Sequence, residues 1–165
     1  TNRPNTPQEF VDQVWPAASK AAAELGVDPA VLVAQAALES GWGRSTPQRS
    51  DGTNSYNLFG IKADSRWQGD RTVVSTLEYE DGVAVRRRDP FRVYGSFDES
   101  FADYARFIRS NPRYQEALSH GANPQAFLSG LQQAGYATDP AYARKVTAVM
   151  QGSTFQEVTE GYRGT

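Results

Sequence analysis

The sequence predicts an α+β fold in which helices predominate and a single β-hairpin interrupts them. Two observations support this: Asx-Pro and Ser/Thr caps open most of the helix-periodic apolar segments, and one Asp-Gly turn separates two β-prone runs. A third observation concerns size, because 165 residues of which 39% are hydrophobic can bury one substantial core. We expect one domain over residues 1–150, in which the hairpin and its flanks, at about 66–95, form a small lobe.

Two helices are expected before the hairpin. Thr6-Pro-Gln-Glu9 is a capping box with proline at the first helical position, and Gly26 can end a helix that runs from about Pro7 to Leu25. Asp28-Pro29 opens the second helix, whose alanines and aliphatic side chains predict burial on most sides. This helix ends near residues 39–41. At about 3.6 residues per turn, one of its stripes contains Leu32, Gln35, Ala36 and Glu39.

The hairpin follows a polar, turn-rich loop over residues 44–57. Its β-prone runs are Arg71 to Tyr79 and Val83 to Arg88, and Asp81-Gly82 favours a tight turn between them. Side chains alternate between the two faces of a strand, so Glu78 shares a face with Val74 and Thr76. We therefore expect Glu78 near the tip of the hairpin.

The rest of the chain is expected to be helical. Ser96-Phe-Asp-Glu99 is a second capping box, and apolar side chains follow it at helical spacing as far as about Arg109. Three Asx-Pro pairs can each cap a further helix: Asn111-Pro112, Asn123-Pro124 and Asp139-Pro140. Residues 151–165 lose the apolar periodicity, so we expect a loosely ordered C-terminal tail there.

Charge and residue types exclude several classes of function. The formal net charge is -2, so no overall field attracts nucleic acid or an anionic membrane. Acidic neighbours dilute the basic cluster Arg86 to Arg88, and we expect no nucleic-acid binding. With no cysteine and one histidine, His120, we expect neither a metal site, nor a serine–histidine triad, nor an organic cofactor. The chain contains no secretion signal, and no apolar stretch approaches the ~20 residues of a membrane-spanning helix.

Glu39 is the strongest candidate for acid–base chemistry, because it ends an apolar helix directly before Gly41-Trp42-Gly43. The negative end of the helix dipole and the apolar neighbours both disfavour the ionised carboxylate and raise its pKa. A carboxyl group that stays protonated near neutral pH can donate a proton to a leaving oxygen, as in glycoside hydrolysis. Its position alone leaves open that Glu39 simply faces solvent.

Aromatic side chains in irregular segments suggest a surface that binds flat apolar groups. Trp42 lies between two glycines, which leave its ring unobstructed by neighbouring side chains. Tyr56, Phe59, Trp67 and Tyr136 occupy other loop-like segments. Such rings either stack on sugars, nucleobases or peptides, or fill a core, and both interpretations stay open.

Six segments together resemble a known family. They are AALESGWG at 36–43, SYNLFGIKA at 55–63, TLEYEDG at 76–82, FRVYGSFDES at 91–100, NPRY at 111–114 and AGYATDPAYARKV at 134–146. In this order, over about Gly26 to Val149, the chain resembles glycoside hydrolase family 73. The resemblance implies a lysozyme-like fold, with a helical lobe and a small β-hairpin lobe around a glycan cleft. It also implies an endo-β-N-acetylglucosaminidase that cleaves the β-1,4 bond between N-acetylglucosamine and N-acetylmuramic acid in peptidoglycan.

The resemblance assigns roles to particular residues. The glutamate of the family's LESGWG motif is its proton donor and matches Glu39, and the hairpin glutamate of the TxEY motif is its proposed second carboxylate and matches Glu78. The tyrosine of the GYATDP motif belongs to the family's catalytic site and matches Tyr136. Five further residues match positions around these motifs and are expected to bind sugar: Trp42, Tyr56, Asn57, Phe59 and Trp67.

Within the family, the motifs most resemble the wall-cleaving domain of a flagellar rod-building protein. This implies local opening of the wall in the periplasm, glycan strands as the binding partner, and rod proteins reached through an N-terminal domain outside this chain. Two alternatives stay open: a lytic transglycosylase or muramidase, and a wall-binding module without turnover. Inverting, retaining and substrate-assisted routes of hydrolysis also stay open.

Overall fold

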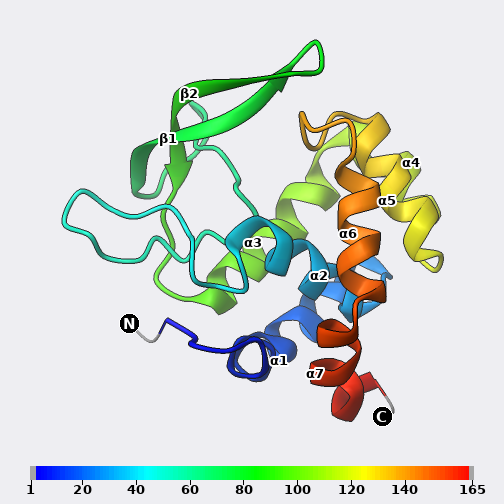
Figure 1. The fold of residues 1–165 in the computed structure, drawn as a ribbon. Helices are drawn as coiled ribbons and strands as arrows, with labels where there is room; N and C mark the ends of the chain where they lie inside the picture. Colours follow the sequence, from blue (N-terminus) through cyan, green and yellow to red (C-terminus); the bar gives the residue numbers. More distant parts are fainter. Residues whose placement is uncertain (1–2, 164–165) are drawn as a thin grey trace.

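The computed structural model describes residues 3–163, in which helices form one body and a hairpin projects from it (Figure 1). The elements in chain order are α1 (Pro7–Leu25), α2 (Pro29–Ser40), β1 (Arg71–Glu80), β2 (Val83–Arg92), α3 (Phe97–Ser110), the 3-10 turn η1 (Pro112–Tyr114), α4 (Gln115–Ser119), α5 (Pro124–Gln133), α6 (Tyr142–Gln151) and α7 (Ser153–Arg163). This order confirms the predicted α+β class, in which helices predominate and one hairpin interrupts them.

Helix α2 lies in the middle of the helical body, in contact with α1, α6 and α7 (Figure 1). Residues 30–37 are all buried, because alanines and aliphatic side chains occupy every face of the helix. Asp28 caps its first turn by accepting a hydrogen bond from the Ala30 N–H at 2.9 Å. Gly41 ends it in the left-handed conformation, with φ +56°. The helix therefore carries Glu39 out of a buried segment at a fixed position.

The hairpin pairs β1 with β2 in antiparallel register, with Glu78 opposite Val85. Asp81 and Gly82 both have positive φ, +52° and +79°, which is the type I′ geometry expected of an Asp-Gly turn. Val73 and Leu77 lie on the outer face and are each 51% exposed. The opposite face carries Glu78 toward the helical body.

A buried ion pair joins the base of the hairpin to α3. Arg92 Nη1 lies 2.8 Å from Asp103 Oδ2, and only 10% and 3% of these two side chains are exposed. The Tyr94 hydroxyl donates to the same carboxylate oxygen, while Arg106 pairs with Oδ1 at 3.0 Å. Desolvated charges of this kind are tolerated only while both partners are present.

Asn57 ties the segment before the hairpin to the same strand. Its buried side-chain amide donates to the carbonyl oxygens of Ile61 and Arg92 at 2.9 and 3.0 Å, and it accepts from the Ile61 N–H at 3.1 Å. These bonds add to the backbone pairing of the loop with β2, in which the Ala63 N–H donates to Pro90 and the Arg92 N–H donates to Ile61. Gly60 and Lys62 consequently take fixed positions under the hairpin.

The expectation of a loosely ordered tail over residues 151–165 is wrong for residues 153–163. These residues form α7, which contacts α1, α2 and α6. Phe155 is buried, and the Trp15 and Tyr162 rings stack at 5.0 Å. Its apolar side chains Phe155, Val158 and Tyr162 recur at helical spacing, a period that the sequence analysis overlooked, and contacts with α1 stabilise the helix. Residues 164 and 165 lie outside the described part of the chain.

Removal of the Asp103 carboxylate should destabilise the fold strongly. We expect Asp103→Ala to lower the free energy of unfolding by about 3–5 kcal/mol, because it leaves Arg92 charged and buried without its partner. Urea denaturation monitored by circular dichroism measures the change. Glu24→Ala, which removes an exposed carboxylate from α1, is the control and should change stability by less than about 0.5 kcal/mol. Equal effects of the two substitutions would contradict the anchoring role.

Candidate active site

A cleft of about 890 Å³ lies between the hairpin and the helical body. It is lined by the end of α2, the segment 57–62, the inner side of β1, the η1 turn, and residues 135–145. Glu39, Glu78 and Tyr136, the three residues predicted to be catalytic, all line it. Side chains that are far apart in sequence therefore meet at one open site.

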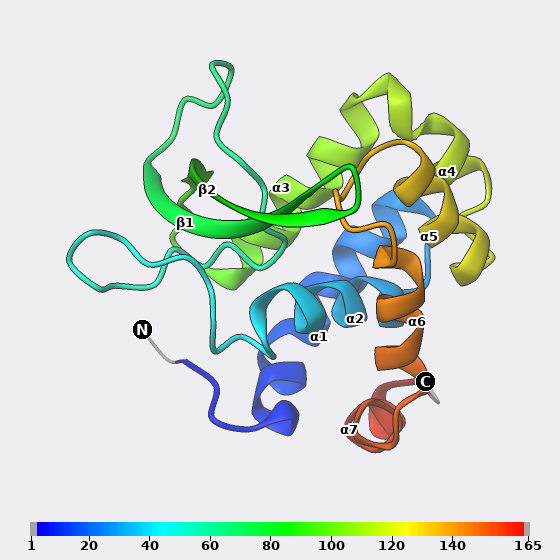
Figure 2. The same cartoon turned by 45° about the horizontal axis from the view of Figure 1, so that its top comes forward.

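Hydrogen bonding closes one side of this cleft across the tip of the hairpin. The Tyr79 N–H on β1 donates to Thr138 Oγ1 at 3.0 Å, and Lys145 Nζ lies 5.7 Å from the centre of the Tyr79 ring. Figure 2 shows the hairpin tip beside the loop that joins α5 to α6. A two-stranded hairpin is only marginally stable by itself, so these contacts help to hold it over the cleft.

Glu39 stands at the floor of the cleft on the last turn of α2. Its side chain is open to water in the cleft, yet protein surrounds it on the other sides, and the resulting loss of hydration raises its pKa to about 7. The charges of Glu78 and Asp139 raise the pKa further, while Lys145 lowers it. The carboxyl group can therefore hold a proton near neutral pH and release it into the cleft.

Gly60 leaves room for the Glu39 carboxyl group. A Cβ atom at Gly60 would lie 3.3 Å from Glu39 Oε2, and the backbone there has φ +63°, a conformation that side chains disfavour. The glycine of the NLFGIK segment thus lets the backbone pass directly beside the carboxyl group. This contact explains the glycine between bulky residues that is visible in the sequence.

Glu78 is held in the cleft by Lys62. Lys62 Nζ lies 3.2 Å from Glu78 Oε1 on β1 and 3.2 Å from Asp89 Oδ2 on β2, so one ammonium group joins both strands. The Glu78 side chain is only 16% exposed. Lys62 follows the segment that Asn57 anchors. The salt bridge therefore fixes Glu78 relative to the helical body as well as to the hairpin.

The Tyr136 hydroxyl is a buried polar group with unused hydrogen-bonding capacity. Among the described residues it makes no hydrogen bond of normal geometry, although the Tyr142 hydroxyl lies close to it. Its ring packs edge-on against Tyr104 and Tyr114. Burial raises the pKa of Tyr136 well above its ordinary value, so the hydroxyl keeps its proton. A buried hydroxyl without a partner is unusual in a native protein and calls for a functional explanation.

A buried chain of hydrogen bonds lies behind these groups, and the sequence analysis missed it. The Tyr104 hydroxyl donates to Gln35 Oε1 at 2.8 Å, and Gln35 Nε2 donates to the Tyr142 hydroxyl oxygen at 2.8 Å. The Tyr142 hydroxyl oxygen thus accepts a hydrogen bond from the helix that carries Glu39. Gln35 precedes Glu39 by one helical turn, and its presence on that apolar stripe was the signal that could have revealed the chain.

The predicted sugar-binding residues divide into two groups. Phe59 and Asn57 line the cleft, where Phe59 stacks on Tyr104 at 4.2 Å and the amide of Asn57 is occupied by backbone groups. Three predicted residues lie outside the cleft: Trp42, Tyr56 and Trp67. Tyr56 packs edge-on against Phe97, and the Trp67 ring lies under the Arg92 guanidinium, 4.7 Å from its centre.

Trp42 packs against the helical body instead of lining the cleft, and its role in sugar binding stays a prediction. The chain has positive φ from Gly41 to Gly43, and this turn directs the indole toward Phe10 and Phe155, at 6.1 and 6.3 Å. A Cβ atom at Gly43 would lie 2.7 Å from Pro4 and 2.8 Å from Phe10, so this glycine is required for close packing. The glycines beside Trp42 serve the core rather than an open ring face.

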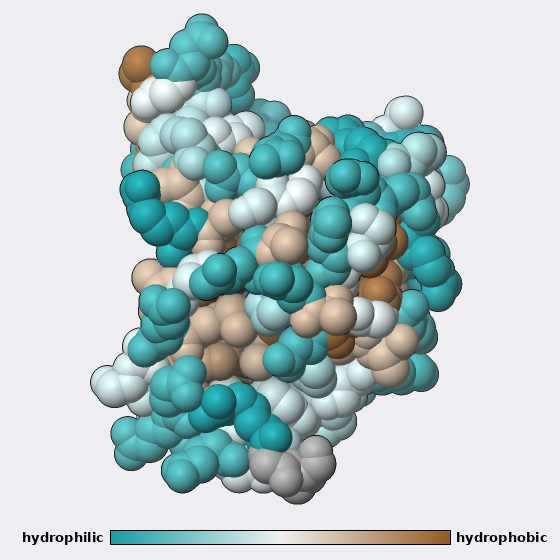
Figure 3. Space-filling view, turned by 90° about the vertical axis from the view of Figure 1, so that its right-hand side faces the viewer, coloured by the Kyte–Doolittle hydropathy of each residue, from teal (hydrophilic) through white to brown (hydrophobic). Residues whose placement is uncertain are grey.

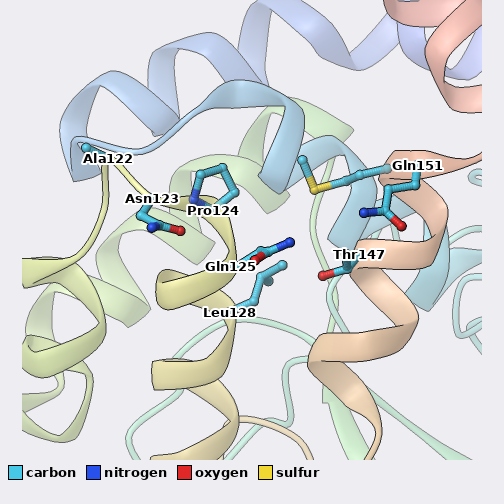
Figure 4. A pocket seen from close by; sticks show the side chains of 8 residues that line it. Ala122, Asn123, Pro124, Gln125, Leu128, Thr147 and Gln151 are labelled. Atoms are coloured by element: carbon cyan, nitrogen blue, oxygen red, sulfur yellow. The ribbon is translucent and has the colours of Figure 1, made fainter.

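A second cavity, of about 430 Å³, lies between α5 and α6 (Figure 4). It is lined by polar amides and apolar side chains, including Gln125, Leu128 and Met150, and none of its lining residues is ionisable. Figure 3 views the molecule from this side, and polar and apolar side chains alternate over its surface. The cavity lacks acid–base groups, and so the carboxylate-lined cleft is the candidate active site.

Two further searches covered residues 3–163. No group of three or more histidine, cysteine or acidic side chains is arranged to hold a metal ion there. No helix in the same range has both the length and the apolar character needed to span a bilayer.

The titration of Glu39 should respond to its charged neighbours in opposite directions. Carbon-13 NMR of the carboxyl group should show a midpoint near pH 7. Asp139→Asn should lower that midpoint, because it removes a negative charge and frees Lys145, whereas Lys145→Met should raise it. Shifts of the same sign in both variants, or a wild-type midpoint below about 5, would contradict this account of the site.

Glu39 should also make stability depend on pH. Its folded pKa of about 7 exceeds the ordinary value of 4.5, so the folded protein binds the proton more tightly than the unfolded chain. The contribution to stability is complete below pH 4.5 and is lost as the pH rises through 7. The difference in unfolding free energy between wild type and Glu39→Gln should therefore change across this window and be constant above it. A pH-independent difference would contradict the raised pKa.

Comparison with known proteins agrees with this geometry. The model of the glucosaminidase family, described as mannosyl-glycoprotein endo-beta-N-acetylglucosaminidase, matches residues 15–154. The chain is 53% identical over 151 residues to the peptidoglycan hydrolase FlgJ of Pseudomonas aeruginosa, an alignment that covers 91% of this chain and 38% of that protein. The chain thus spans less than half the length of this relative.

Two solved structures share the fold. A mutant peptidoglycan hydrolase from Sphingomonas sp. A1 superposes with a TM-score of 0.88 at 46% identity, over 94% of this chain and 99% of that one. The glycoside hydrolase domain of Salmonella typhimurium FlgJ superposes with a TM-score of 0.72 at 37% identity, over 96% of each chain. The family match, the identities and the fold agree with one another: this chain belongs to the glucosaminidase family of glycoside hydrolases, family 73, and is homologous to the glycoside hydrolase domain of FlgJ.

Proposed function

We propose that this chain hydrolyses peptidoglycan as an endo-β-N-acetylglucosaminidase, with Glu39 as the general acid. The bond cleaved is the β-1,4 link on the reducing side of N-acetylglucosamine, next to N-acetylmuramic acid. The observation that carries the proposal is the Glu39 carboxyl group, which has a pKa raised to about 7 and opens into the cleft. At neutral pH a large fraction of such a group is protonated, so it can donate a proton to the leaving sugar oxygen.

In the proposed reaction Glu39 donates its proton to the glycosidic oxygen as the bond to the anomeric carbon breaks. Positive charge then develops on the anomeric carbon and ring oxygen of the N-acetylglucosamine unit. Glu78, on the wall formed by β1, supplies the negative charge that stabilises it. Lys62 orients the Glu78 carboxylate and so acts as a positioning residue.

Glu78 has a second task in the proposed reaction, which is to activate the attacking water. The water transfers a proton to Glu78 while its oxygen bonds to the anomeric carbon, and the anomer inverts. Tyr136 keeps its hydroxyl proton and makes no hydrogen bond of normal geometry with the described residues, so it can donate to the acetamido carbonyl of the bound sugar. Tyr136 thereby selects N-acetylated sugars and positions them relative to Glu39 and Glu78.

The FlgJ relatives suggest the biological setting. We infer that the chain opens peptidoglycan locally for assembly of the flagellar rod, in the periplasm, and that a further domain of a longer protein contacts rod proteins. The support is the identity to FlgJ and the short share of that relative that the chain spans. The enzymatic proposal does not depend on this setting.

Replacement of Glu39 tests the general-acid role. Glu39→Gln should lower kcat on purified peptidoglycan by about 10²- to 10⁴-fold, since glutamine keeps the shape but has no proton to transfer. Mass spectrometry of wild-type digests should show reducing-end N-acetylglucosamine. Glu24→Gln is the matched control and should be as active as wild type. Anhydro-muramic ends would indicate a lytic transglycosylase instead. Full activity of Glu39→Gln would exclude Glu39 as the general acid, and absence of turnover by wild type would point to a wall-binding module.

Replacement of Glu78 tests the second carboxylate. Glu78→Gln should lower kcat by about 100-fold or more with little change in KM, because the lost charge acts in the transition state. Proton NMR of the first products formed by wild type should show the α-anomer. Near-wild-type turnover of Glu78→Gln would exclude it as the base and favour participation of the substrate's own acetamido group. A β-anomeric first product would exclude inversion.

A further inference from the structure

One cation of the cleft has no carboxylate partner among the described residues. The cleft is lined by four cations: Lys62, Arg66, Arg113 and Lys145. Lys62 pairs with Glu78 and Asp89, Arg66 with Asp64, and Lys145 with Asp139. Within residues 3–163, Arg113 forms no ion pair, and its side chain is exposed.

The surroundings of Arg113 hold it in place without using most of its donors. Arg113 belongs to η1, between Asn111 and Tyr114, which also line the cleft. Its Nη1 lies 3.5 Å from the Ala134 carbonyl oxygen, and its Cζ is 5.5 Å from the centre of the Tyr114 ring. A guanidinium carries five N–H donors, so most of them stay free for a ligand. The guanidinium thus lies beside residues 134 and 135 at the cleft.

The polysaccharide backbone offers Arg113 no charge. N-acetylglucosamine is neutral, and the lactyl carboxyl of N-acetylmuramic acid is consumed in the amide bond to the stem peptide. The free carboxylates of peptidoglycan therefore lie on the stem peptides, which branch from alternate sugars. A guanidinium matches a carboxylate in geometry and can bind it through two parallel N–H···O bonds.

We propose that Arg113 binds a free carboxylate of the stem peptide and thereby makes the enzyme prefer glycan that carries stems. This inference rests on the proposed function, because it requires peptidoglycan in the cleft. It assigns Arg113 to substrate selection and leaves the proton transfer to Glu39. Lys145, rather than Arg113, is the cation that lowers the Glu39 pKa, which agrees with that separation.

The basic cluster that is obvious in the sequence does not supply this site. Arg86 and Arg88 lie opposite Leu77 and Ser75 in the hairpin, on the outer face that also carries exposed Leu77. Arg87 pairs with Glu80. None of the three lines the cleft. Arg113, a single residue of the NPRY segment, is the cleft cation that has no carboxylate partner among the described residues.

Chemical neutralisation of the stem carboxylates tests the proposal. Two substrates are needed: uncross-linked glycan strands with native stems, and the same strands after carbodiimide coupling to methylamine. For wild type, kcat/KM should fall about three- to tenfold on amidation, in line with the loss of one charge-assisted contact. Arg113→Gln should show a similar loss on native strands and no further loss on amidated strands, as in a double-mutant cycle.

Two variants serve as controls. Arg109→Gln removes an exposed arginine of α3 that does not line the cleft, and it should discriminate between the substrates as wild type does. Arg113→Lys keeps the charge without the planar fork and should retain part of the preference. Raising the ionic strength should weaken the wild-type preference, because salt screens an exposed ion pair.

The possible outcomes separate this inference from the proposed function. Equal wild-type rates on native and amidated strands would overturn the inference alone. Retention of the full wild-type preference by Arg113→Gln would do the same, because Arg113 would then bind sugar or stabilise the loop. Failure of wild type to cleave either preparation would overturn the proposed function, and the inference with it.

Discussion

The burial of α2 on every side is the constraint on which the rest of the structure depends. Its alanines let α1, α6 and α7 approach closely, and residues 30–37 leave no surface to water. A helix enclosed in this way cannot shift or rotate without opening the core. It delivers Glu39 to the cleft from a rigid support, and it carries Gln35 one turn earlier to bind the tyrosines behind the site.

The second carboxylate has a different kind of support. Glu78 belongs to a two-stranded hairpin, which gains rigidity from contacts at both ends: the Arg92–Asp103 pair at its base and the Thr138 hydrogen bond near its tip. Lys62 adds a third contact from the loop below. The two carboxyl groups are thus held by independent parts of the fold, and their separation depends on how the hairpin is anchored rather than on either strand alone.

The same charged groups that build the cleft also set the protonation of Glu39. Glu78 and Asp139 raise its pKa, and Lys145 opposes them while pairing with Asp139. Loss of hydration contributes most to the raised pKa of Glu39. The shape of the cleft therefore largely determines how strongly this carboxyl group holds its proton. This differs from the sequence argument, which relied in part on the helix dipole. With the other cleft cations paired, Arg113 is the one without a carboxylate partner among the described residues.

Much of the fold could be predicted from the sequence, and so could three residues that the structure brings together in the cleft. Capping residues and the Asp-Gly turn act over a few residues, so they determined the ends of α1, α2 and α3 and the hairpin without reference to the rest of the chain. The resemblance to the family, carried by short motifs, led to Glu39, Glu78 and Tyr136. Only the tertiary structure decided which aromatic rings line the cleft, because Trp42 packs against Phe10 and Phe155, which lie far from it in the sequence. It also decided the pairings of Gln35 with Tyr142 and of Lys62 with Glu78, since such contacts depend on how distant segments are brought together.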